Sequence, residues 1–259
     1  MINDTSFKSA YLSTYYFETL RIIKPLMPPQ EQSVYDIPKI NGVLAGSKKF
    51  KSNSITVRGI IYGTDPENLI TRLSNLASFL YSDADQPLIF NNQSAQYYNA
   101  QYLDTQEILR EISFSMIDLI FTCNDPLAYA ITPTVDLTNI TIIDTFYVIN
   151  NGGHYYSFPL ISVVFNAIQN HIYIQNTSVA DNRIDISKSF EIGDTLEIDC
   201  KKRTVKLNGA YSPAGFGEGG LGFAEWIILA AGNNIMQVGS EDMAIDVSVT
   251  ISFEKVYLY

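Results

Sequence analysis

The residues that could carry out chemistry in this chain are few and widely separated. Its two histidines are His154, beside a glycine-rich turn, and His171, at the start of a predicted strand; neither has a second His or Cys at metal-ligand spacing. Cys123 and Cys200 each follow an apolar stretch, which predicts buried, reduced thiols. No G-x-S-x-G nucleophile motif occurs. We therefore expect no catalytic residue, no metal site and no cofactor.

Two further patterns invite a chemical interpretation and have simpler structural ones. The glycine-rich run 215–222 has the composition of a phosphate loop, but no predicted helix follows it and Glu218 would repel a phosphate. We interpret it as a loop between strands. Glycoside hydrolysis needs two carboxylates whose separation is set by the fold, so the sequence leaves that chemistry open. Glu197 and Asp199 alternate with apolar residues, which predicts the wet face of a hairpin.

Aromatic side chains form the candidate ligand or partner surface. Tyr155 and Tyr156 follow a turn, and one of them must point outward if the segment is extended. Together with Tyr211 and Phe216, they could stack on a sugar or contact a protein. Trp226 begins an apolar stretch and is interpreted as a core residue.

One segment has the pattern of a helix, and the sequence predicts it over residues 65–81. Thr64 and Glu67 have the spacing of a capping box, and Pro66 falls in the first turn. Apolar residues then recur at helical spacing on one predicted face: Leu69, Ile70, Leu73, Leu76, Ala77 and Leu80.

Nearly all of the remaining chain alternates between apolar and polar residues, which is typical of strands. Ile55, Val57 and Ile61 share one predicted face before the helix. The range 109–123 is predicted to be one long strand whose apolar side changes near Asp118, which indicates a bulge or a change of packing environment.

The second half is predicted to consist of strands and turns. The ranges 140–149 and 226–229 each have the pattern of an apolar strand. The final strand, 245–254, alternates regularly, with one apolar face: Ile245, Val247, Val249, Ile251 and Phe253. Many short antiparallel strands joined by turns indicate a β-sandwich.

The first pattern ends near Asn124-Asp125-Pro126, so we expect a domain boundary near Ala130. The chain is then mostly β, with an N-terminal β-domain, 1–130, that carries the helix, and a C-terminal sandwich, 131–259. Residues 1–20 lack the apolar segment of a signal peptide, and the apolar run 226–231 is too short to span a bilayer. The net charge of −10 disfavours direct nucleic-acid binding.

The order of these segments resembles the distal tail protein (Dit) family of long-tailed, non-contractile bacteriophages (siphophages), whose members are baseplate or tail-tip hub components. The strings that carry the resemblance are Thr56-Val57-Arg58-Gly59-Ile60-Ile61-Tyr62-Gly63, Phe121-Thr122-Cys123-Asn124-Asp125-Pro126, Gly193-Asp194-Thr195-Leu196-Glu197-Ile198-Asp199-Cys200 and Arg203-Thr204-Val205-Lys206-Leu207-Asn208-Gly209. Each string alone is short, and their order and spacing extend the resemblance over essentially the whole chain.

The resemblance implies a structural protein of the virion tail tip, assembled in the host bacterial cytoplasm, and not an enzyme. The N-terminal domain would form a homo-hexameric ring, for which 50–62 and 109–123 are the candidate contact segments. The C-terminal domain would be a galectin-like or carbohydrate-module-like β-sandwich on the outside of the ring.

The implied partners are the tail tube protein, the tail-associated lysin or tail-tip protein, and receptor-binding proteins, with no membrane contact. DNA would pass through the lumen without specific binding. The aromatics leave open an alternative, a carbohydrate-binding sandwich that recognises host cell-wall glycans, and the carboxylates leave open a glycan-degrading enzyme.

Overall fold

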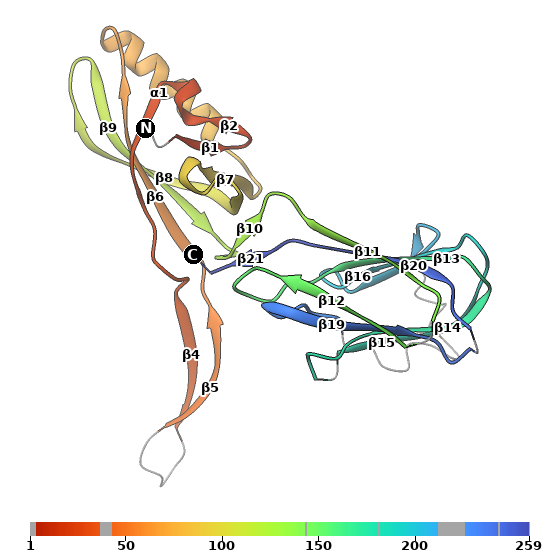
Figure 1. Ribbon diagram of the computed structural model, residues 1–259. Helices are drawn as coiled ribbons and strands as arrows, with labels where there is room; N and C mark the ends of the chain where they lie inside the picture. The colour runs from red at the N-terminus through yellow and green to blue at the C-terminus, as the bar shows by residue number, and fades with distance from the viewer. Residues whose placement is uncertain are drawn as a thin grey trace. The chain divides into compact units, whose positions relative to one another are not determined.

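The computed structural model describes residues 4–36, 43–142, 144–180, 182–211, 226–242 and 244–258. The described chain is mostly β, as predicted, and contains a single α-helix, α1 (Pro66–Leu80). It divides into two compact units (Figure 1). The first comprises Met1–Ile131 with Leu258–Tyr259, and the second comprises Thr132–Tyr257.

The first unit is built on one antiparallel sheet with the strand order β2-β1-β7-β8-β9-β6-β3. A short strand, β10 (Ala128–Ala130), also pairs with β8, and β4 (Gln30–Asp36) and β5 (Val43–Phe50) form a separate two-stranded ribbon. Two 3-10 turns, η1 (Leu12–Tyr15) and η2 (Asn91–Gln93), connect strands. The bounds of the main sheet are β1 (Thr5–Phe7), β2 (Ala10–Tyr11), β3 (Phe17–Ile23), β6 (Asn53–Tyr62), β7 (Gln86–Phe90), β8 (Gln96–Arg110) and β9 (Phe114–Cys123).

The helix lies within one residue of its predicted range at each end, but its cap differs from the prediction. Asp65, not Thr64, is the N-cap residue, and its Oδ1 accepts a hydrogen bond from Asn68 N at 2.8 Å. Asn68 Oδ1 in turn accepts one from Thr64 N at 3.2 Å, so Asn68 takes the part predicted for Glu67.

The buried face of the helix is narrower than predicted. Leu69, Leu76 and Leu80 are buried, whereas Ile70 is 57% exposed and Ala77 is exposed. A wide apolar face in the sequence therefore overstates the area that packs against the sheet.

The predicted long strand 109–123 is wrong, because the chain turns back on itself inside it. β8 ends at Arg110 and β9 begins at Phe114, and Ile112 in the turn is 75% exposed. The change of apolar side near Asp118 therefore does not come from a bulge in this strand. The register shifts between β8 and β9 leave the extra residues on β8.

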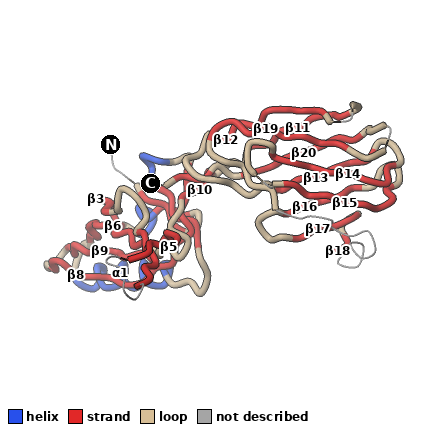
Figure 2. Tube along the Cα trace, turned by 90° about the horizontal axis from the view of Figure 1, so that it is seen from below, coloured by secondary structure: helices blue, strands red, loops and turns tan. Residues whose placement is uncertain are grey.

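The second unit is a sandwich of two antiparallel sheets, a six-stranded one with the order β11-β20-β13-β16-β17-β18 and a four-stranded one with the order β12-β19-β14-β15. Figure 2 shows these strands in red. The bounds are β11 (Thr134–Ile140), β12 (Thr145–Asn151), β13 (Leu160–Phe165), β14 (Gln169–Asn176), β15 (Arg183–Phe190), β16 (Thr195–Asp199), β17 (Thr204–Leu207), β18 (Ala210–Tyr211), β19 (Gly232–Gly239) and β20 (Val247–Phe253), followed by the short β21 (Val256–Tyr257).

Two strand predictions in this half are corrected. The range 140–149 is not one strand: β11 ends at Ile140 and β12 begins at Thr145 in the other sheet. Residues 226–229 form no strand, only an isolated bridge between Ser157 and Leu229.

A single core cluster fills the space between the two sheets. The apolar face predicted for the final strand is buried there, from Ile245 to Phe253, and Trp226 packs against it as a partly buried residue. Both cysteines are buried and unpaired, as predicted, and burial raises the pKa of each thiol to about 12.

Candidate functional site

The structure brings Tyr155 and Tyr156 together at the entry to β13. Their ring centroids lie 4.1 Å apart, and burial, reinforced by a hydrogen bond to Tyr156, raises the pKa of Tyr155 to about 12. Phe158, which the sequence did not single out, stands edge-on to Tyr156 at 5.3 Å. Tyr156 and Phe158 are each 38% exposed, so this cluster offers aromatic edges at the surface.

The other two predicted aromatics do not join this cluster within the described residues. Tyr211 lies on β18, three strands away from β13 in the six-stranded sheet. Its ring is contacted by Lys206 Nζ, 5.2 Å from the ring centroid. Phe216 lies outside the described residues, as does the glycine-rich run 215–222.

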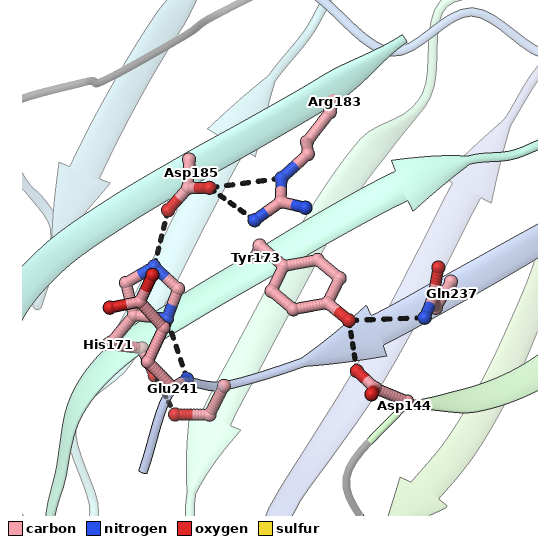
Figure 3. Close-up of polar contacts among 8 residues, drawn as sticks. Asp144, His171, Tyr173, Arg183, Asp185, Gln237 and Glu241 are labelled. Carbon is pink, nitrogen blue, oxygen red and sulfur yellow. Dashed lines mark hydrogen bonds and ion pairs between the residues drawn. The ribbon is translucent and has the colours of Figure 1, made fainter.

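A polar network that the sequence did not reveal lies on the outer face of the four-stranded sheet (Figure 3). His171 Nδ1 accepts a hydrogen bond from Glu241 N at 3.0 Å, so Nε2 is the ring nitrogen that faces Asp185. Arg183 Nε donates to Asp185 Oδ2 at 2.9 Å. Asp185 is therefore shared between a cation and an imidazole.

Tyr173 lies on the same face, with its ring packed over Gly239 of the neighbouring strand β19. The Tyr173 hydroxyl donates to Asp144 and accepts from Gln237 Nε2 at 3.1 Å, while the Arg183 guanidinium lies 4.0 Å from the ring centroid. A Cβ at Gly239 would come within 2.5 Å of the Tyr173 ring. Since these groups satisfy one another, the network is suited to fixing β12, β14, β15 and β19 to each other.

His171 and Tyr173 carried one usable signal in the sequence. They alternate with the core residues Ile172 and Ile174, which places both on the outer face of the sheet. The alternation could not show that Asp144 and Asp185 reach the same face from other strands.

The structure shows no arrangement suited to metal binding or membrane crossing in the part of the chain that it describes. There, no three His, Cys, Asp or Glu side chains are grouped to hold a metal ion. None of the helices in those residues has the length and apolar character needed to cross a bilayer.

The first unit has a different kind of candidate site, a sheet with one packed face. Ile55, Val57 and Ile61 of β6 are buried, as predicted, together with Leu119 and Phe121 of β9. On the opposite face, Arg58 donates two hydrogen bonds to Asp118, and Ile60, Met116 and Ile120 are only half-buried.

Besides the two-residue terminal strand β2, this sheet has two longer open edges. β3 pairs only with β6, and beyond Ala100 β8 pairs only with β9, among the residues that the structure describes. Unpaired edges of this length are sites at which another strand can add. The candidate contact segments of the sequence, 50–62 and 109–123, fall mainly on the central strands β6 and β9, and only Leu109 and Arg110 lie on the open part of β8.

Two family models match the chain, one in each unit. The phage tail protein RIFT-related domain matches residues 11–122, and the siphovirus-type tail component, C-terminal domain, matches residues 152–257. The chain belongs to the siphophage distal tail protein family. The predicted resemblance is thereby confirmed, and a structural role at the phage tail tip follows from membership.

A curated relative and a solved structure agree with this assignment. The distal tail protein of Bacillus phage SPP1 is 28% identical over 188 residues, which cover 69% of this family member and 72% of the relative. The crystal structure of SPP1 Dit, described as a paradigm of the hub adsorption apparatus in phages that infect Gram-positive bacteria, matches with a TM-score of 0.79 and 18% identity. The match covers 98% of this chain and 99% of SPP1 Dit, which shows a shared fold over both units.

Proposed function

We propose that this distal tail protein is an adaptor that closes into a ring of six copies at the tail tip and is not an enzyme. The ring joins the tail tube protein to the tail-associated lysin or tail-tip protein, supports receptor-binding proteins, and leaves a central conduit for DNA. The number of copies and the partners are those that the family resemblance implies.

The observation that carries the proposal is the pair of open edges in the first unit. Three antiparallel pairings separate β3 from β8, so these two strands run in opposite directions. When copies repeat by rotation about an axis along the strands, β3 of one copy meets β8 of the next in the antiparallel sense used inside the sheet.

Two different edges also favour a closed ring over a symmetric pair. A contact between unlike surfaces is heterologous, and it generates a ring when the rotation between copies closes. The net charge of −10 disfavours binding of DNA to the protein, because negative charges repel phosphates.

The test is the oligomeric state of the full chain, free and in assembled tails. Light scattering combined with negative-stain imaging should show discrete six-copy rings, and imaging of intact particles should place the ring at the tail tip. Tails in which this protein forms no ring would contradict the proposal.

The aromatic cluster supports a second candidate function, recognition of host cell-wall glycans by the sandwich. Tyr156 and Phe158 present ring edges at the surface beside Tyr155. Wild-type protein should then bind on a glycan array, and Tyr156→Ala should abolish binding whereas Tyr211→Ala should not. An empty array with wild-type protein would remove this candidate.

A further inference from the structure

We propose that the seam between neighbouring copies is made by bulges on the two open edges, with Leu20 of β3 packed against Leu103 and Ile108 of β8 in a second copy of the chain. This inference rests on the proposed ring and names the residues that would close it.

The first edge carries one bulge. On β3, Thr19 is paired with Gly59 and Arg21 is paired with Arg58, so Leu20 is an extra residue without a partner on β6. Its side chain is 45% exposed. A large aliphatic group therefore stands in solvent where the sheet ends.

The second edge carries two such bulges. Register shifts between Tyr102 and Asp104, and between Glu107 and Leu109, leave Leu103 and Ile108 as the extra residues on β8. Leu103 is 62% exposed and Ile108 is 44% exposed. The two edges therefore share one feature, an unpaired residue that is aliphatic and exposed.

Bulges also occur on edge strands that must not pair, where they twist the edge away from a neighbour. That protective role is usually assisted by charged or polar residues at the edge, because apolar residues there favour association. Here the extra residue is aliphatic at all three bulges, which indicates that the positions are covered in the assembly.

The charged residues beside the bulges differ in sign between the two edges. Arg21, next to the β3 bulge, is exposed and has no carboxylate partner in the described part of the chain. Asp104 and Glu107 are exposed beside the β8 bulges, and Glu107 Oε1 accepts a hydrogen bond from Ser115 Oγ at 3.4 Å and lies 3.7 Å from Arg110 Nε. β3 also carries the half-buried Glu18, so the contrast rests on the groups beside the bulges. Arg21 of one copy can face Asp104 or Glu107 of the next, whereas β8 against β8 would bring carboxylates together.

The first test replaces an apolar side chain of the proposed contact with a charged one. Leu20→Asp and Leu103→Asp should each lower the fraction of protein in rings by tenfold or more at a fixed concentration. Ile192→Asp is the matched control, because Ile192 is 69% exposed in the turn between β15 and β16 of the second unit. Thermal unfolding of each variant separates loss of assembly from loss of folding.

The second test traps the contact without disturbing it. Leu20→Cys combined with Leu103→Cys, or with Ile108→Cys, should give a ladder of covalent oligomers up to the ring when treated with a short bismaleimide. Each single variant should stay monomeric on a denaturing gel, because the seam joins unlike edges. The native Cys123 and Cys200 are 0% and 1% exposed and should not react.

The outcomes separate this inference from the proposed function. If wild-type protein forms no ring even in tails, the proposed function fails and the seam fails with it. If rings form but both double-cysteine variants give no ladder, or both Asp variants assemble normally, only the seam is wrong. Asp variants that close rings but no longer join a tail would assign the bulges to another tail protein and overturn the inference.

Discussion

Arg58 donates two parallel hydrogen bonds to Asp118, from Nε to Oδ1 and from Nη2 to Oδ2, each 2.8 Å long. The two residues are register partners on β6 and β9, on the face opposite the buried core of the first unit. The Asp118 side chain is 9% exposed and that of Arg58 is 37% exposed. The hydrogen bonds to Asp118 raise the pKa of the Arg58 guanidinium above its usual value.

The unequal burial of this pair predicts unequal effects of mutation. Arg58→Met should lower the melting temperature by several degrees, because it leaves a buried carboxylate without its cation. Asp118→Asn should lower the melting temperature by less, since the half-exposed guanidinium of Arg58 can be hydrated by solvent. Thermal unfolding followed by circular dichroism measures both, and equal losses would show that the pair is as well solvated as a surface ion pair.

Gly239 should tolerate no side chain in the sandwich. A Cβ there would approach Tyr173 Cζ and Oη and Asp144 Oδ1 to 2.5 Å each, so Gly239→Ala should destabilise the protein by about 1–3 kcal/mol. Gly152→Ala is the control, because its nearest neighbours would lie at 3.6 Å or more. Similar urea midpoints for the two variants would contradict the close packing of Tyr173 over Gly239.

Two tyrosines of the same sandwich should respond differently to loss of their hydroxyl. Tyr147 Oη is buried and has no hydrogen-bond partner among the described residues, and burial raises the pKa of Tyr147. Tyr147→Phe should therefore leave stability unchanged or raise it by up to about 1 kcal/mol. Tyr173→Phe should lower it by about 1 kcal/mol, because the hydrogen bond that the Tyr173 hydroxyl donates to Asp144 and the one that it accepts from Gln237 are lost together. A loss of stability in Tyr147→Phe would mean that its hydroxyl is bonded.

Alkaline pH should unfold the protein partly through Tyr173. Burial, assisted by the hydrogen bond to Asp144, raises the pKa of Tyr173 from 10.0 to about 12. The folded state therefore favours the neutral phenol, and this stabilisation is complete below pH 10 and is lost as the pH rises from 10 to about 12.

The measurement is the melting temperature of wild type and Tyr173→Phe across that pH range. The wild-type value should fall more steeply, and the gap between the two proteins should narrow as the pH rises. Parallel curves would show that Tyr173 ionises equally in the folded and unfolded states.

The sequence predicted those features that depend on local periodicity. Alternation in β20 and in Ile55, Val57 and Ile61 identified faces that are buried, because a strand turns every second side chain to the same side. The helix was predicted to within one residue at each end for a similar reason. Its cap was assigned to the wrong residue, since Thr64 and Asp65 have equally suitable side chains and only the backbone at Asp65 takes the capping conformation.

Errors arose where apolar residues continue through a turn. Ile112 continues an apolar run in the sequence but lies exposed between β8 and β9, and Ile142 does the same between β11 and β12. A period of two carries no information on where a chain reverses unless turn residues mark the place. The bulges at Leu20, Leu103 and Ile108 are invisible for a related reason, because each is defined by the register against a neighbouring strand.

By itself, the sequence determined that this chain is mostly β with one helix, buries both cysteines, and has segments in the order of the siphophage distal tail family. Only the tertiary structure decided which strands are edges, that β3 and β8 run in opposite directions, and that Tyr173 lies across Gly239 beside Asp144. Side-chain alternation is a property of one strand, whereas edges, registers and polar networks are relations between strands that are distant in sequence and meet only on folding.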